Sequence, residues 1–199
     1  MNRVSLYIPC FNASGYLKEC LEAVLKQTYP IYEILVIDDG STDDTLKIAS
    51  TFSVRCISNE RNLGLAAVRN IAIRQAKGDL IASLDADCSP DPFWLQRLME
   101  DITDERIAGA GGRVLEKEGG LADIWRKNHM PQDWGKDRII NPQFLYGANT
   151  LFRKNSLEAV GLYNEEYKTN NEDVDISTRL RQKGFSLVYD PQALSLIHI

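Results

Sequence analysis

Apolar residues in the first half of the chain follow two alternating patterns. Nearly continuous apolar runs predict four buried strands, at residues 4–8, 34–37, 54–57 and 79–84. Between the runs, apolar residues recur at helical spacing, which predicts helices from residue 17, after residues 42–44 and over residues 65–76. Buried strands that alternate with helices are typical of a parallel sheet with helices on both faces. The pattern therefore predicts an α/β fold.

The regular alternation ends near residue 105. Beyond it, the sequence predicts strands at residues 107–115 and 144–153, a short helix capped by Asn155, and a helix over residues 172–183 stopped by Gly184. We expect one domain over residues 1–199, in which residues 1–105 and 106–199 build the two walls of a cleft. Because a strand-like apolar run reaches residue 199, we also expect a fragment of a longer chain.

Composition narrows the class of protein. A chain of 199 residues with 44% apolar residues can bury one core. Its net charge of −5 disfavours a broad nucleic-acid surface, which needs clustered basic residues, so we expect small-molecule or sugar partners and no nucleic acid. No apolar run reaches the length of a membrane span and no signal peptide is recognisable, so we expect a cytoplasmic protein. Four scattered cysteines beside apolar segments predict buried, reduced thiols.

Polar segments follow the ends of all four predicted strands. They lie at residues 9–12, 38–41, 58–59 and 85–87. In open parallel sheets, ligands bind beyond the carboxyl ends of the strands. We therefore expect these segments to converge on one rim that forms a binding site.

Asp85 and Asp87 set two carboxylates at the mouth of an apolar strand. Mg²⁺ and Mn²⁺ take oxygen ligands and are commonly held by one or two carboxylates together with substrate phosphates. The pair predicts a divalent-metal site that serves a phosphorylated small molecule. Two alternatives remain open for the pair alone, which are the aspartyl nucleophile of a phosphatase and solvated loop aspartates.

Six segments taken together closely resemble family 2 glycosyltransferases with the GT-A fold, at residues 8–12, 36–43, 62–70, 84–87, 147–149 and 171–175. The resemblance covers nearly the whole chain. It implies a Rossmann-like, mostly parallel sheet with an acceptor-side region in residues 106–199. It also implies an inverting, metal-dependent enzyme of cell-surface glycan synthesis, which moves a sugar from a nucleotide-diphosphate donor to an acceptor hydroxyl. Glycan, lipid-linked and protein acceptors remain open.

The resemblance assigns nucleotide-sugar binding to residues along the rim, namely Pro9, Phe11, Asn12, Asp38, Asp39, Arg69, Asp85, Ala86 and Asp87. An aromatic ring at Phe11 can stack on a base and Asp39 can accept the base N–H, which suits uracil. Each role has an ordinary structural alternative. Phe11 would be a core aromatic, Asp38 a turn residue, and Arg69 a solvated helix arginine.

The same resemblance implies that Asp87, with Asp85, holds Mg²⁺ or Mn²⁺. The cation would stabilise negative charge on the departing nucleotide. His198 is a further candidate metal ligand, against the alternative of an ordinary histidine near the end of the chain.

The family's catalytic base lies in the acidic motif at the start of a helix, matched here by Glu172 and Asp173. Asp173 is our candidate for taking the proton of the acceptor hydroxyl, so that attack on the anomeric carbon inverts its configuration. Simple helix-capping acids are the alternative at this position, and we expect Asp175 to be only a helix residue.

Three other functions are alternatives to an enzyme of this family. A sugar nucleotidyltransferase would need a Gly-rich basic loop after the first strand, and a phosphatase would need Asp85 on the first strand. A non-catalytic sugar-nucleotide or glycan-binding module is the stronger alternative. Processive members of the family that the chain resembles carry a Gln-x-x-Arg-Trp motif, which residues 1–199 lack. Either the motif lies beyond residue 199 or, as we favour, the enzyme adds a single sugar. Tryptophan and basic residues at 125–134, with His129, predict either an acceptor-facing or membrane-facing lip or an ordinary amphipathic helix, which keeps peripheral association with the inner face of the membrane open.

Overall fold

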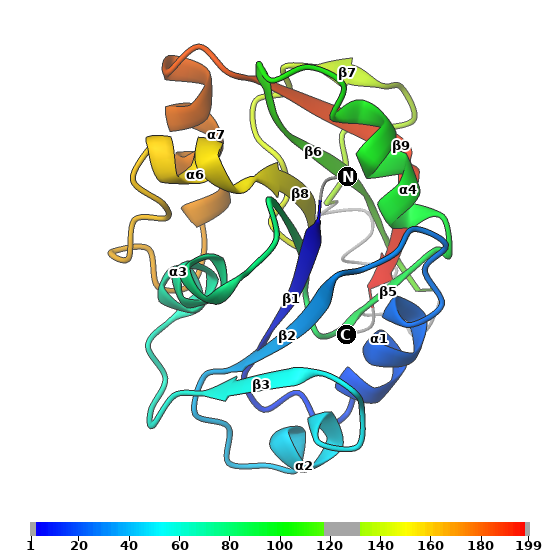
Figure 1. Ribbon diagram of the computed structural model, residues 1–199, viewed down its shortest axis with the longest axis vertical. Coiled ribbons are helices and arrows are strands. Elements are labelled where there is room, and N and C mark those ends of the chain that lie inside the picture. The colour runs from blue at the N-terminus through cyan, green and yellow to red at the C-terminus, as the bar shows by residue number, and fades with distance from the viewer. Residues whose placement is uncertain (1–2, 118–131, 198–199) are drawn as a thin grey trace.

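A computed structural model describes residues 3–117 and 132–197 of the chain. His198 and His129 therefore lie outside the described residues, and so does most of the segment with the predicted lip. Within the described ranges, the strands form one nine-stranded sheet in the order β3-β2-β1-β4-β8-β6-β9-β5, with β7 paired to β9. Helices lie against both faces of this sheet (Figure 1).

The first half of the chain has the alternation that its apolar pattern predicts. Its elements are β1 (Val4–Cys10), α1 (Leu17–Val24), β2 (Glu33–Asp38), α2 (Thr45–Ala49), β3 (Arg55–Ser58), α3 (Leu65–Gln75) and β4 (Leu80–Leu84). The four strands are parallel, with β1 between β2 and β4. Every residue of β1 and β4 is buried, which explains why these two strands have no polar alternation.

The remaining elements extend the sheet with antiparallel and parallel pairs. They are β5 (Cys88–Pro90), α4 (Trp94–Asp101), β6 (Ile107–Glu116), β7 (Ile139–Ile140), β8 (Asn149–Arg153), α6 (Lys154–Ala159), α7 (Glu172–Gln182) and β9 (Ser186–Ile197). Strand β8 runs antiparallel to both β4 and β6, and β6 is parallel to β9. Residues far along the chain thereby lie beside the ends of the parallel strands.

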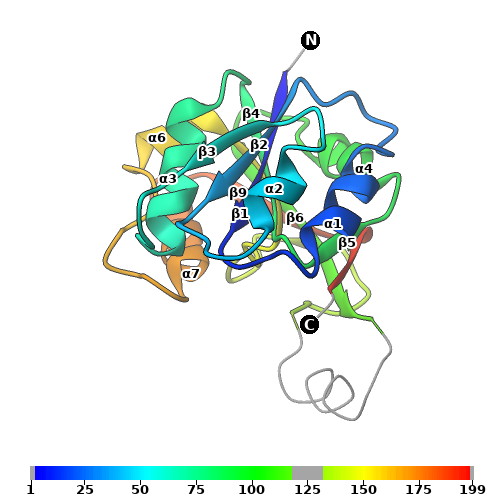
Figure 2. The same ribbon diagram turned by 90° about the horizontal axis from the view of Figure 1, so that it is seen from below.

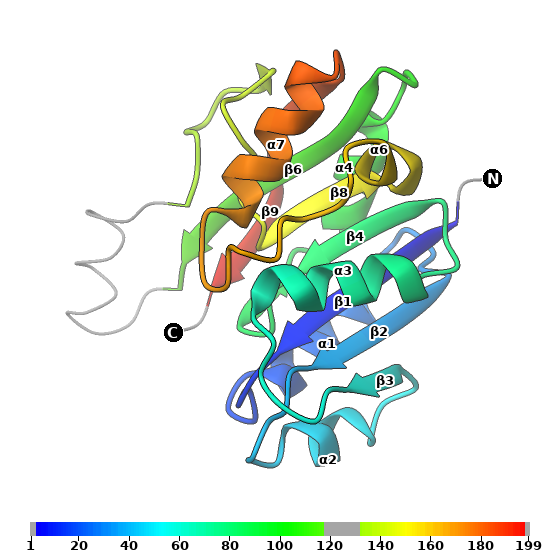
Figure 3. The same cartoon turned by 90° about the vertical axis from the view of Figure 1, so that its left-hand side faces the viewer.

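Two apolar cores separate the helices into two layers. The core that contains Leu21 and Trp94 packs α1, α2 and α4 against one face of the sheet. The core that contains Ile73 and Leu180 packs α3, α6 and α7 against the other face. Figures 2 and 3 show the second group together on one side of the strands. The expectation of helices on both faces is confirmed.

Three local predictions are wrong. Asn155 lies inside α6, whose N-cap is Arg153, because the chain enters the helix directly from β8. The strand predicted from residue 144 begins only at Asn149, whose N–H donates to the carbonyl of Tyr146 in a turn. All four cysteines are free, but Cys56 is exposed because β3 is an edge strand.

The hydropathy of the helices bears on membrane association. Within the parts of the chain that the structure describes, none of the helices combines the length and the apolar character needed to cross a membrane.

Candidate functional site

The loops beyond the parallel strands interlock on one rim, as the sequence predicts. The backbone N–H of Asn12, after β1, donates to Ser41 Oγ at 2.9 Å, and the Asn12 side-chain oxygen accepts the N–H of Thr42 at 2.9 Å. Asn59, after β3, donates its side-chain amide to Asp39 Oδ1 at 2.8 Å. Three loops distant in sequence are thus tied into one surface.

The two aspartates at the end of β2 have different surroundings. The Asp38 carboxylate is buried and accepts the N–H of Ser41 at 3.3 Å and the hydroxyl of Ser58 at 3.0 Å, which agrees with the turn-shaping alternative. The Asp39 carboxylate accepts the N–H groups of Leu63 and Gly64 in addition to the Asn59 amide. Asp39 therefore holds the loop that leads into α3 while it also faces a cavity.

That cavity, pocket A, has a volume of about 410 Å³ and lies over the ends of β1 and β2. Its lining includes Pro9, Cys10, Phe11, Asp39, Asn62, Asp85 and Lys168. The Phe11 side chain is 51% exposed, which excludes the core-aromatic alternative. Lys168, from the loop before α7, also lines this cavity.

A second cavity, pocket B, has a volume of about 420 Å³ and lies beside the start of α7. Its lining includes Arg69, Asp85, Gln132, Tyr146, Gly147, Asn170, Glu172 and Asp173. Pockets A and B share Leu65, Asp85 and Thr169. Asp85, at the end of β4, thus stands at the border between the two cavities.

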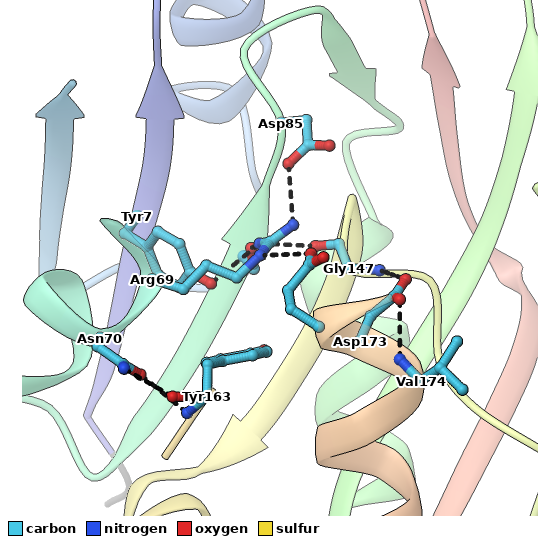
Figure 4. Close-up of polar contacts among 10 residues, drawn as sticks. Tyr7, Arg69, Asn70, Asp85, Gly147, Tyr163, Asp173 and Val174 are labelled. Carbon is cyan, nitrogen blue, oxygen red and sulfur yellow. Dashed lines mark hydrogen bonds and ion pairs between the residues drawn. The ribbon is translucent and has the colours of Figure 1, made fainter. Parts of the chain in front are cut away.

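Arg69 is the buried centre of pocket B, with only 1% of its surface exposed. Figure 4 shows its guanidinium reaching toward Asp85 from α3. The guanidinium donates to Ser83 Oγ at 2.7 Å, to Tyr7 Oη at 3.1 Å and to Glu172 Oε1 at 3.2 Å, and it pairs with Asp85 Oδ1 at 3.5 Å. The solvated-arginine alternative is therefore excluded.

The Arg69 guanidinium also determines the electrostatics of its neighbours. Burial raises the pKa of Asp85, while the positive charge of Arg69 acts against that rise. Burial likewise raises the pKa of Glu172, and Arg69 again opposes the rise. Glu172 is only 3% exposed, so its carboxylate serves mainly as the buried counter-ion of Arg69. Gly147 closes over the guanidinium, since a Cβ there would lie 2.6 Å from Arg69 Nη2.

Asp173 is held at the first turn of α7, facing pocket B. One of its oxygens accepts the N–H of Gly147 at 3.1 Å and the other accepts the N–H of Val174 at 2.8 Å (Figure 4). Asp175, two residues further along, pairs instead with Arg179 at 2.9 Å. It lies outside both pockets, in agreement with the expectation that it is only a helix residue.

Comparison with known proteins assigns the family. The family model "Glycosyl transferase family 2" matches residues 5–161. The chain belongs to glycosyl transferase family 2. Among curated members, it is 32% identical to Glycosyltransferase AglE of Haloferax volcanii, over 94% of this chain and 64% of AglE. It is 30% identical to a poly-beta-1,6-N-acetyl-D-glucosamine synthase of Staphylococcus epidermidis, over 96% of this chain and 48% of the synthase. The chain therefore spans between about half and two thirds of these relatives.

Solved structures show that this family 2 chain has the GT-A fold. The S. aureus protein TarS in complex with UDP superposes with a TM-score of 0.81 at 20% identity, over 99% of this chain and 60% of TarS. The mannosyltransferase PcManGT from Pyrobaculum calidifontis, in complex with GDP-Man and Mn²⁺, superposes with a TM-score of 0.76 at 20% identity, over 98% of this chain and 56% of PcManGT.

The two carboxylates of Asp85 and Asp87 fit a divalent cation whose remaining ligands would come from a bound substrate. Burial, with the neighbouring charge of Asp85 second, raises the pKa of Asp87 to about 6. A cation would relieve this crowding of two carboxylates. Asp87 lies outside pockets A and B, and Ala86 between the two aspartates is buried. Within the described ranges, no group of three or more His, Cys, Asp or Glu side chains could enclose a metal.

Several residues that line the pockets escaped the sequence analysis, among them Asn62, Gln132, Tyr146, Lys168, Thr169 and Asn170. Lys168 to Asn170 come from the loop before α7, whose Lys168 carbonyl accepts the N–H of Leu65 at 2.9 Å. The only sign of this loop's role in the sequence is the pair of asparagines at 170 and 171, directly before the acidic motif. Only the fold brings this loop against the start of α3.

Proposed function

We propose that this chain is the catalytic domain of an inverting glycosyltransferase, which moves a sugar from a nucleotide-diphosphate donor to an acceptor hydroxyl. One observation carries the proposal. Pockets A and B meet at Asp85, so a donor in pocket A and an acceptor in pocket B would have their reacting groups close together. The domain would be part of a longer protein, with residues 1–105 on the donor side and 106–199 on the acceptor side.

Pocket A suits the nucleotide half of a donor. The exposed ring of Phe11 can stack on a base. Asp39 lines the same pocket, and its carboxylate is the acceptor that the pocket offers to a base N–H. Lys168 would neutralise part of the diphosphate charge. A uridine nucleotide is our first choice, which the UDP complex of the similar TarS structure supports.

Asp85 and Asp87 are the residues that would hold Mg²⁺ or Mn²⁺. A bound cation of this kind offsets the negative charge that develops on a leaving diphosphate. Asn12 and Asp38 would not contact the donor. Their hydrogen bonds would hold the loops that carry Phe11 and Asp39 in position.

Asp173 would be the general base. Its carboxylate borders pocket B and is oriented by two backbone N–H groups, which leaves lone pairs for an incoming hydroxyl. When that hydroxyl attacks the anomeric carbon from the face opposite the diphosphate, Asp173 takes its proton and the configuration inverts. Glu172 would not share this task, because its carboxylate is buried against Arg69.

The proposed biological setting is supported only by the names of relatives. The Staphylococcus epidermidis relative is named a poly-beta-1,6-N-acetyl-D-glucosamine synthase, which supports a role in polysaccharide synthesis, and we assign that role to the cell surface as part of the proposal. We place the activity in the cytoplasm, with association at the inner face of the membrane as part of the same proposal.

Isothermal titration with uridine, guanosine and thymidine diphosphates, each with Mn²⁺ and with a chelator, tests the proposal. We expect one nucleotide to bind only with Mn²⁺, and Asp87→Ala to lose that dependence. Absence of binding to the folded chain would contradict a donor site. The rival interpretation, a non-catalytic binding module, predicts nucleotide binding without any donor hydrolysis or transfer.

A further inference from the structure

The lining of pocket B contains uncharged polar side chains that the proposed transfer does not by itself require. Apart from the acidic groups and the buried Arg69, its polar lining is made of uncharged side chains, including Gln132, Thr169, Asn170 and Asn171. Amide groups can donate and accept at the same time. Such a lining matches a ligand rich in hydroxyl groups, which also donate and accept.

The charges around pocket B oppose an anionic ligand. Three carboxylates border it, those of Asp85, Glu172 and Asp173. Arg69 is the only cationic side chain in the described lining, and its guanidinium is buried and already bonded to acceptors within the protein. A phosphate or carboxylate on the acceptor would therefore meet like charges, and no side chain of the described lining is free to receive it. A cation held by Asp85 and Asp87 would already be engaged by the donor diphosphate. Pocket A differs, because a lysine, Lys168, is among its lining residues.

One wall of pocket B is aromatic. Tyr146 lines the pocket, and its ring packs edge-on against Phe144, with a centroid distance of 4.9 Å and an interplanar angle of 69°. Trp134 lies behind both rings, 6.0 Å from Tyr146 by centroid, and its Nε1–H donates to the Phe144 carbonyl at 2.9 Å. The Tyr146 ring is thus fixed in orientation by neighbours. The negative face of such a ring attracts the C–H groups on the apolar face of a pyranose.

We propose that pocket B binds an uncharged pyranose of the acceptor, with one sugar face against Tyr146 and its hydroxyls toward Gln132 and Asn170. The acceptor hydroxyl would then be presented to Asp173 by a neutral glycan. The same arrangement disfavours an acceptor whose phosphate or carboxylate must enter the pocket. This inference rests on the proposed function and specifies its acceptor class.

Acceptor competition tests the inference. The wild-type chain is incubated with Mn²⁺ and a nucleotide sugar that it hydrolyses. Methyl glycosides of glucose, galactose, mannose and N-acetylglucosamine are then compared as acceptors with their 6-phosphates. We expect at least one neutral glycoside to accept the sugar, with kcat/KM roughly tenfold or more above that of its 6-phosphate. Equal or better use of the phosphorylated form, or donor hydrolysis that no neutral glycoside diverts to transfer, would overturn the inference.

Two substitutions at one position separate the ring from its hydroxyl. Tyr146→Ala should lower the acceptor kcat/KM about tenfold, whereas Tyr146→Phe should stay within about threefold of wild type, because the ring remains. Tyr32→Ala is the matched control, since Tyr32 is half exposed and stacks on Arg3 at the start of β1, away from both pockets. Equal kcat/KM in Tyr146→Ala and Tyr32→Ala would overturn the assigned stacking. If the wild-type chain does not bind nucleotide, the proposed function is contradicted. Failure of the proposed function is therefore distinguishable from failure of the acceptor assignment.

Discussion

Replacing Arg69 by methionine should cost more stability than any other single change at the site. The pair of Arg69 with Glu172 has a distance of 3.2 Å, and its side chains are 1% and 4% exposed. Removing one partner of a buried pair leaves an uncompensated charge, which typically costs about 3–5 kcal/mol. Arg69→Met also leaves the hydroxyls of Tyr7 and Ser83 without their donor, although these neutral groups cost less. We therefore expect a loss of about 4 kcal/mol in the free energy of unfolding.

Urea unfolding followed by circular dichroism at pH 7.5 measures this loss. Arg74→Met is the control on the same helix, because Arg74 pairs with Glu165 at 3.6 Å with side chains that are 59% and 51% exposed. Such a pair is worth about 1 kcal/mol or less. Adding Glu172→Gln to Arg69→Met should recover part of the loss, since it removes the stranded charge. A loss at Arg69 no larger than that at Arg74 would refute the reasoning.

Three further predictions concern individual residues. Phe11→Ala should weaken UDP binding by about 1–3 kcal/mol in calorimetric titration if the ring stacks on the base, and unchanged affinity would show that it does not. Gly147→Ala should lower the free energy of unfolding by about 1–3 kcal/mol, because its Cβ would meet the immobilised Arg69 guanidinium at 2.6 Å; a neutral result would mean that the loop shifts freely. Burial raises the pKa of Asp101, so its contribution to stability is complete at acid pH and is lost as pH rises through the folded pKa. The free energy of unfolding should therefore decrease less between pH 4 and pH 8 in Asp101→Asn than in the wild type. An equal decrease in both proteins would contradict this.

The parallel half of the sheet could be predicted because its physical signals are local. Strands buried on both faces must be continuously apolar, and the polar residues that end them lie on one rim as a consequence of parallel direction. The pairing of β1 with β2 and β4, and the hydrogen bonds from Asn12 to the loop after β2, confirm both inferences.

The rest of the molecule depends on contacts that sequence patterns do not encode. The strands β5 and β7 escaped prediction because they have only three and two residues and pair with the distant strand β9. Helix α4 was also not predicted, although it has eight residues, as many as α1. The ionic partner of Arg69 lies 103 residues away in Glu172. Its charge could be seen in the sequence, but its burial could not. For the same reason, Glu172 was a plausible base by its type and position, and only the fold pairs it with an arginine.

Asp173→Asn tests the central claim most directly, with Asp175→Asn as the matched control from the same acidic motif. Donor hydrolysis and transfer would be measured beside nucleotide affinity for the wild type and both variants. The account predicts that Asp173→Asn keeps nucleotide affinity within about twofold while its rate falls about 100-fold or more, and that Asp175→Asn changes the rate little. Equal rates in wild type and a folded, nucleotide-binding Asp173→Asn would contradict the account.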